Sequence, residues 1–201
     1  MTFKISVVMA AYNSGEHLAI AMDSLINQSL DFNQNIQVII VDDASSDNTL
    51  DVALGYKHRY PENVIVVSNE INRGASYSRN VGLNHVEGEY VNFLDSDDYM
   101  TENTFKKVLE MFGEHDEIDI ASVPIYFFGS KTGEHNLNYK YAKSRVVDLL
   151  KEPDNIQLSG ASAFFRFSKL KNYRFQETLK ISEDSLLINQ MLLKNPKIGF
   201  N

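Results

Sequence analysis

The residues most suited to chemistry in this chain form an acidic run, Asp95-Ser96-Asp97-Asp98. Three carboxylates within four residues repel one another unless a cation lies among them. Mg²⁺ and Mn²⁺ prefer carboxylate oxygens and leave room in their coordination shell for phosphate oxygens. The run therefore predicts a divalent-cation site, or else the acidic surface loop that a bare Asp-x-Asp most often marks.

A second acidic pair, Asp42-Asp43, follows an apolar stretch and precedes a run of Ala and Ser. Carboxylates in that place can accept hydrogen bonds from a nucleobase imide or a ribose hydroxyl. Asp is equally common in turns that cap the following helix, so a purely structural role is the alternative. Tyr12 ends another apolar stretch, where it can pack against neighbours or stack on a base.

Two arginines and a third acidic position complete the candidate site. Arg73 and Arg79 flank and enter a segment with a helical pattern, where they can face a diphosphate or a base. A surface salt bridge is the alternative for Arg79. Asp184 lies at the start of the last helical segment, where acidic side chains stabilise the helix dipole. The same residue could act as a general base on an acceptor hydroxyl.

Composition narrows the classes of partner. The chain has 201 residues and a net charge of −8, and it shows no basic run, which argues against a nucleic-acid partner. An acidic protein that binds a diphosphate needs a cation as a bridge. The absence of cysteine excludes disulfides, thiolate zinc sites and cysteine nucleophiles. No apolar stretch reaches the roughly 18 to 20 residues that span a bilayer.

Alternating apolar strands and helices must position these residues in the first half of the chain. Strands that are apolar throughout, each followed by a helix, indicate a mostly parallel sheet with helices on both faces. Right-handed crossovers place the carboxyl ends of such strands at one edge, where ligands bind. Asn13 and Glu16 are spaced like a capping box for the first helix. We predict strands at residues 4–11, 36–41, 63–68 and 89–94, and helices at 13–28, 46–60 and 74–86.

The second half is less regular. Its pattern predicts an amphipathic helix at residues 101–112 and a long strand at 118–128. A polar and aromatic stretch, 129–143, is expected to form a loop over the site. The remaining expected elements are a strand or turn-rich segment at 159–167, a helix at 182–194 and a strand beginning at 197.

Five stretches together resemble the family 2 glycosyltransferases of the GT-A fold. They occur in the family's order and extend over nearly the whole chain; they are SVVMAAYN, IIVDDASSDNT, NRGASYSRNVGL, GEYVNFLDSDDY and SEDSLL. The resemblance implies a single α/β GT-A catalytic domain. Residues 1–100 would bind the nucleotide sugar, and 101–201 would carry the acceptor site and the catalytic base. Because strand 197 begins so close to Asn201, we expect the sequence to be part of a longer protein.

The resemblance also implies an inverting, metal-dependent enzyme that transfers a hexose or N-acetylhexosamine from a UDP-sugar, or from another nucleoside-diphosphate sugar, to a hydroxyl acceptor. Asp97 and Asp98 would bind Mn²⁺ or Mg²⁺, and Asp184 would be the catalytic base. The acceptor would be a glycan, a lipid-linked glycan or a polymer of the cell surface or cell wall. The expected location is the cytoplasm, with peripheral association at the inner membrane face as a further option. The implied donor-binding residues are Ala11, Tyr12, Asp42, Asp43, Arg79, Asp95 and Ser96.

Two other enzyme classes and one non-enzyme class are the alternatives to this function. A nucleotidyltransferase that makes sugar nucleotides would carry Arg and Lys in a Gly-rich loop after its first strand, where this chain has AAYNSGEH. A dinucleotide-dependent dehydrogenase would carry G-x-G-x-x-G after a strand, and none is present. The non-enzyme alternative is a glycosyltransferase-like module that binds a nucleotide or a partner without turnover. The presence of both Asp97 and Asp184 favours an enzyme.

Overall fold

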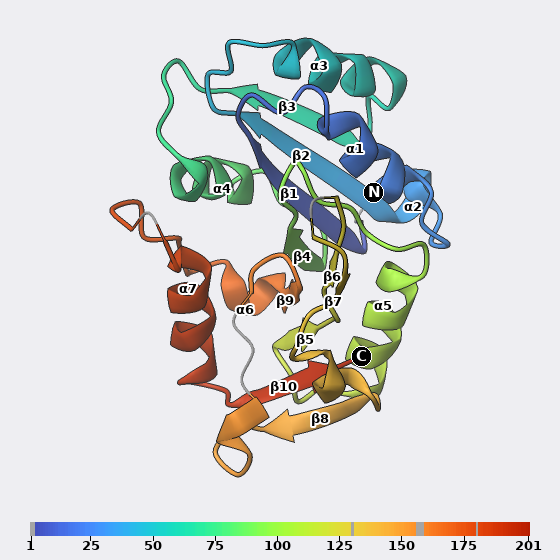
Figure 1. The fold of residues 1–201 in the computed structure, drawn as a ribbon, viewed down its shortest axis with the longest axis vertical. Helices are drawn as coiled ribbons and strands as arrows, with labels where there is room; N and C mark the ends of the chain where they lie inside the picture. The colour runs from blue at the N-terminus through green and yellow to red at the C-terminus, as the bar shows by residue number, and fades with distance from the viewer. Residues whose placement is uncertain (1–2, 130, 156–158, 180) are drawn as a thin grey trace.

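The computed structural model describes residues 3–129, 131–155, 159–179 and 181–201. Its centre is an eight-stranded sheet with the strand order β3-β2-β1-β4-β9-β5-β10-β8. The N-terminal half of the chain forms the upper part of the molecule in Figure 1, and the C-terminal half forms the lower part. Within the described ranges, no helix is long and apolar enough to cross a membrane.

Four parallel strands build the N-terminal half, and they fall where the apolar stretches predict them. They consist largely of β-branched and other apolar residues, which suits strands that are covered on both faces. The helices that follow three of them are α1 (Leu18–Ile26), α3 (Thr49–Arg59) and α4 (Ala75–Leu83). The strands are β1 (Ile5–Ala11), β2 (Ile36–Asp42), β3 (Val64–Ser68) and β4 (Tyr90–Phe93).

The C-terminal half extends the same sheet with shorter strands. β9 inserts antiparallel between β4 and β5, and β10 pairs parallel with β5 and antiparallel with β8. A separate hairpin of β6 (Tyr126–Phe127) and β7 (Gly133–Glu134) lies beside the sheet. The added strands are β5 (Ile120–Ser122), β8 (Arg145–Asp148), β9 (Ala163–Arg166) and β10 (Lys197–Phe200).

Helices cover both faces of the sheet, as predicted. Buried residues of α1, α3 and α5 (Thr104–Glu114) pack on one face, and those of α4 and α7 (Glu183–Leu192) pack on the other. The shorter elements are α2 (Phe32–Asn35), α6 (Phe167–Leu170) and the 3-10 turns Asn138–Tyr141 and Pro153–Asn155.

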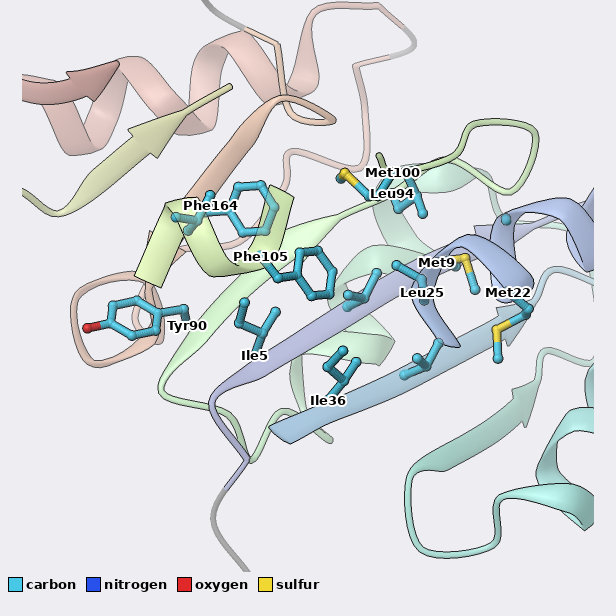
Figure 2. Close-up of a cluster of buried hydrophobic side chains, with 14 of the residues drawn as sticks. Ile5, Met9, Met22, Leu25, Ile36, Tyr90, Leu94, Met100, Phe105 and Phe164 are labelled. Atoms are coloured by element: carbon cyan, nitrogen blue, oxygen red, sulfur yellow. The ribbon is translucent and has the colours of Figure 1, made fainter. Parts of the chain in front are cut away.

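One hydrophobic core joins the two halves of the chain. Figure 2 shows Phe105 of α5 and Phe164 of β9 beside Ile5 of β1 and Tyr90 of β4. The rings of Phe105 and Phe164 meet edge to face, with centroids 5.7 Å apart. Because these side chains share one buried cluster, β2, which ends at Asp42, and β4, which ends two residues before Asp95, pack against the C-terminal half.

Several local predictions are wrong in detail. Residues 118–128 form two short strands, β5 and β6, because the chain leaves the central sheet between them. The stretch 129–143, expected to be a loop, includes β7 and a 3-10 turn. Asn13 does not cap α1, which begins at Leu18 after His17. The Asn13 side chain instead accepts a hydrogen bond from the Ser46 N–H across the edge of the sheet, at 2.8 Å.

Candidate functional site

The carboxyl ends of β1 and β2 form the floor of the candidate site. Ala11 pairs with Asp42 in the parallel ladder, and the Asp43 N–H donates to the Ala11 carbonyl at 2.8 Å. Ala11 is fully buried, whereas Tyr12 is 52% exposed and projects from the strand end. Ala44, just beyond, has a left-handed backbone with φ of 59°. Such conformations cost energy for a residue with a Cβ and recur at functional sites.

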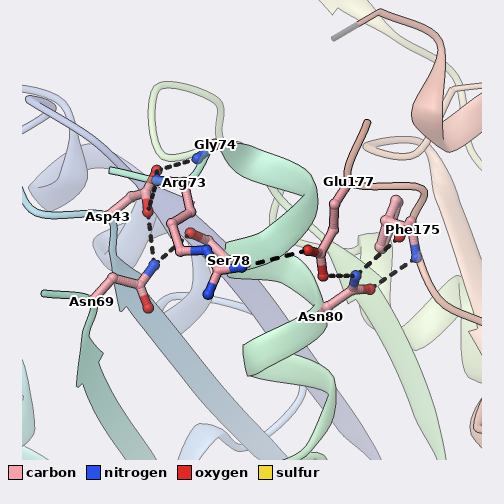
Figure 3. A network of polar contacts seen from close by, with 8 residues as sticks. All are labelled: Asp43, Asn69, Arg73, Gly74, Ser78, Asn80, Phe175 and Glu177. Atoms are coloured by element: carbon pink, nitrogen blue, oxygen red, sulfur yellow. Dashed lines mark hydrogen bonds and ion pairs between the residues drawn. The ribbon is translucent and has the colours of Figure 1, made fainter. Parts of the chain in front are cut away.

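Asp43 anchors the loop that leads into α4, as Figure 3 shows. Its carboxylate accepts hydrogen bonds from the N–H groups of Arg73 and Gly74, the shorter at 2.7 Å, and from the Asn69 amide at 2.7 Å. Gly74 can take part because it lacks a Cβ and adopts φ of 88°. The buried carboxylate therefore stabilises the N-terminal end of α4. The alternative from the sequence pattern is a cap on the helix that follows directly, which is α3.

Asp42 differs from Asp43 in having an acceptor left over. Its Oδ2 accepts long hydrogen bonds from the Ser45 N–H at 3.3 Å and the Ser68 hydroxyl at 3.4 Å. Its Oδ1 is buried and has no hydrogen-bond partner among the described residues. A buried polar atom without a partner costs about 1–3 kcal/mol, and more when it is charged. Of the two carboxylates, Asp42 is the one with capacity for a further donor.

Arg79 of α4 connects two acidic segments that are far apart in sequence. It donates to Asp95 at 2.7 Å and to Glu183 at 2.7 Å, and its side chain is only 12% exposed. Burial by itself lowers the pKa of Arg79, but the charges and hydrogen bonds of Asp95 and Glu183 outweigh it and raise the pKa above its usual value. The arginine is thus a well-enclosed bridge between the end of β4 and the start of α7.

The acidic run after β4 is graded in exposure. The Asp95 side chain is half-exposed, Ser96 is buried with its hydroxyl donating to Ser14 at 2.9 Å, and Asp97 is exposed. Burial, together with the negative charges of Asp95 and Asp97, raises the pKa of Asp98 to about 6. A cation beside these carboxylates would relieve that repulsion.

The same residues fit a loosely held cation better than an all-protein metal site. Across the described parts of the chain, no three His, Cys, Asp or Glu side chains converge as metal ligands. Mg²⁺ and similar ions are commonly held by one or two carboxylates, while phosphate and water oxygens complete the shell. Asp97 and Asp98 can supply such a partial set of ligands.

Asp184 is held by two backbone donors. Its Oδ2 accepts from the Gly160 N–H at 2.7 Å, and its Oδ1 accepts from the Ser185 N–H at 2.7 Å. Gly160 favours this approach, because a Cβ there would lie 3.0 Å from the Asp184 Cβ and 3.3 Å from its Oδ2, which is tight. Ser182, two residues earlier, turns the chain into α7 with a left-handed φ of 64°. The Asp184 carboxylate is therefore fixed in orientation.

Two residues outside the predicted set help to position Asp184. Glu183 carries the Arg79 bridge, and its only sequence signal is its place beside Asp184. Asn80 holds the segment before α7: its amide donates to the Phe175 carbonyl at 3.0 Å and accepts from the Phe175 N–H at 2.8 Å (Figure 3). Successive residues of α4, Arg79 and Asn80, thus fix the chain on both sides of the turn that precedes Asp184.

Comparison with known proteins gives these features a context. The chain is 42% identical over 198 residues to the minor teichoic acid biosynthesis protein GgaB of Bacillus subtilis, covering 98% of this chain and 22% of GgaB. It is 31% identical to a poly(ribitol-phosphate) beta-glucosyltransferase of Bacillus spizizenii, covering 98% of this chain and 30% of that enzyme. The chain thus spans less than a third of the length of these two relatives.

A solved structure shares the fold. S. aureus TarS 1-349, in its complex with UDP-GlcNAc, superposes with a TM-score of 0.85 at 30% identity, covering 98% of this chain and 55% of TarS 1-349. The predicted GT-A fold, with a large α/β sheet, is confirmed by this likeness. The glycosyl transferase family 2 model matches residues 6–174, a segment that includes every predicted site residue except Asp184. A match over most of the chain shows that it belongs to glycosyl transferase family 2.

Proposed function

We propose that this chain is the catalytic domain of an inverting glycosyltransferase that moves a sugar from a UDP-sugar to a hydroxyl of a cell-wall or cell-surface glycan. The observation that carries the proposal is the Asp95–Arg79–Glu183 bridge, with 2.7 Å contacts on both sides. It supports the proposal because it joins Glu183, the neighbour of the candidate base Asp184, to Asp95 of the acidic run. Relatives named for teichoic acid glycosylation, and a similar enzyme crystallised with UDP-GlcNAc, support the same conclusion.

The nucleotide would lie across the carboxyl ends of β1 and β2. Tyr12 offers an exposed ring for stacking on the base, and Ala11 contributes fully buried backbone at the strand end. Asp43 would face the base, and the unpaired Oδ1 of Asp42 can accept a hydrogen bond from the nucleoside. Asp95, Ser96 and Arg79 would line the ribose, sugar and diphosphate portion of the donor. The ion pairs of Arg79 keep its charge in place before the donor arrives.

The reaction would be one in-line displacement at the anomeric carbon. Asp184 removes the proton from the acceptor hydroxyl, whose oxygen forms the new bond as the bond to the diphosphate oxygen breaks and UDP departs with the electron pair. Asp97 and Asp98 would hold Mn²⁺ or Mg²⁺, which when bound offsets the charge on the leaving diphosphate. Because the acceptor oxygen attacks opposite the leaving group, the anomeric configuration inverts. We expect the enzyme to work in the cytoplasm or at the inner membrane face, where a UDP-sugar donor would be supplied.

Calorimetric titration with UDP tests the donor site. We expect UDP to bind in the presence of Mn²⁺, and Asp97→Asn to abolish the metal-dependent part of the affinity. Asp116→Asn is the matched control, because it removes an exposed carboxylate from the turn before β5, at the opposite ends of the strands. If UDP fails to bind under any metal condition, the UDP assignment is wrong; other nucleoside diphosphates are then tested, and the non-catalytic module becomes the better description if they also fail to bind.

A further inference from the structure

A cavity of about 480 Å³ lies beside the acidic run and is lined in part by Asp98. Its volume falls within the range of small-molecule sites, about 300–1,000 Å³. Its walls come from the chain after β4 and the first turns of α5, from the segment that includes β6, from the loop before β9 and from the residue after β10. Candidate nucleotide contacts such as Tyr12, Asp42 and Asp43 are not among its walls.

The cavity lies near both the candidate cation ligands and the candidate catalytic base. Asp98 lines it and directly follows Asp97. Ala161 and Ser162, which also line the cavity, directly follow Gly160, whose N–H donates to Asp184. A molecule in the cavity therefore lies next to the chain segments that carry the cation ligands and hold the base. In a displacement reaction the acceptor occupies that place.

The cavity is rimmed by large aromatic side chains that the fold leaves half-exposed. Tyr99 and Phe128 are 45% and 44% exposed, and their rings meet edge to face with centroids 4.7 Å apart. Tyr126, also on the wall, is 53% exposed. Exposed apolar surface gathered around a cavity marks a binding site more often than scattered single residues do. Among the described residues that line the cavity, only Asp98 and Lys107 have charged side chains.

We propose that this aromatic-rimmed cavity is the acceptor subsite and that it binds a pyranose ring of the acceptor by stacking on Tyr99 and Phe128. This inference rests on the proposed glycosyltransferase function. The electron-rich face of an aromatic ring attracts the slightly positive C–H groups on one face of a pyranose, while the sugar hydroxyls stay at the rim. An open-chain polyol has no continuous C–H face, and one lysine against one aspartate gives a phosphate little net attraction.

Saturation-transfer NMR tests this proposal directly, because it detects millimolar binding and needs no turnover. The probes are methyl pyranosides of glucose, galactose and their N-acetylamino forms, with ribitol 5-phosphate as the open-chain comparison. We expect transfer to the ring C–H protons of at least one pyranoside. Removing an aromatic ring, in Tyr99→Ala or Phe128→Ala, should weaken binding roughly three- to tenfold.

Three controls separate a loss of stacking in the cavity from a general loss of binding. Tyr99→Phe keeps the ring and should bind like the parent, and Tyr139→Ala removes a tyrosine that is 68% exposed but does not line the cavity. UDP affinity should be the same in every variant as in the parent protein. If the parent protein itself does not bind UDP, that result counts against the proposed function and not against the subsite. Absence of pyranoside signals, signals from ribitol 5-phosphate alone, or pyranoside signals that survive both alanine variants would overturn the proposal.

Discussion

Replacing Glu183 with glutamine removes one charge from the bridge that joins the two halves of the candidate site. Arg79 and Glu183 are 12% and 16% exposed and are 2.7 Å apart. An exposed ion pair contributes about 0–1 kcal/mol, whereas breaking a fully buried one costs about 3–5 kcal/mol. Glutamine keeps an oxygen that can accept from Arg79, and Asp95 still neutralises the guanidinium. We therefore expect Glu183→Gln to lower the free energy of unfolding by about 1–2 kcal/mol.

The same change should reduce turnover more than donor binding. Glu183 directly precedes Asp184, so a loosened bridge lets the start of α7 shift, and a displacement of about 1 Å can cost about a hundredfold in rate. We expect kcat to fall roughly ten- to a hundredfold. The dissociation constant for UDP should change little, because the proposed contacts to the nucleobase, Tyr12 and Asp43, are untouched.

Urea denaturation and steady-state kinetics on a matched pair of variants measure both effects. Glu152→Gln is the control, because Glu152 is 45% exposed, pairs with Arg145 at 2.9 Å and lies outside the candidate site. It should change the free energy of unfolding by less than about 0.5 kcal/mol. Equal stability and equal turnover for the two variants would refute the idea that the Arg79 bridge positions the base.

Four further substitutions test separate parts of the site. Ala44→Gly relieves a φ of 59° and should raise the free energy of unfolding by about 0.5–1 kcal/mol; a lower urea midpoint would contradict this. Gly160→Ala introduces a Cβ 3.0 Å from the Asp184 Cβ, so kcat should fall while UDP affinity measured by calorimetry holds; unchanged kcat would contradict it. Asp43→Asn should mainly lower stability, and Asp42→Asn should mainly weaken UDP binding, because only Asp42 retains an unpaired oxygen; the reverse pattern would refute that division.

The sequence was informative wherever a local pattern determines structure. The long apolar stretches of β1 and β2 identified buried parallel strands, and this placed Tyr12 and Asp43 at one edge of the sheet. Short strands carry no comparable periodicity. The insertion of β9 between β4 and β5, and the existence of β8, depend on pairings with distant parts of the chain.

The partners of the candidate residues were harder to predict than the residues themselves. Arg79 and Glu183 are 104 positions apart, and no spacing rule relates them. The hydrogen bonds of Asp43 come from the loop before α4, because the parallel sheet brings that loop to the end of β2. The sequence pattern allows Asp43 either a contact with a nucleobase or a role in a local turn. Its hydrogen bonds to the distant loop before α4 are visible only in the tertiary structure.

Sugar transfer with and without Asp184 tests the central claim most directly. The protein is incubated with a panel of UDP-sugars, Mn²⁺ and a glycan acceptor. UDP release is followed over time, and the anomeric configuration of the product is determined by NMR. We predict transfer with inversion, and a loss of about 10²–10⁴ in rate for Asp184→Asn at unchanged UDP affinity. Transfer with retention of configuration, or full activity in Asp184→Asn, would contradict the account.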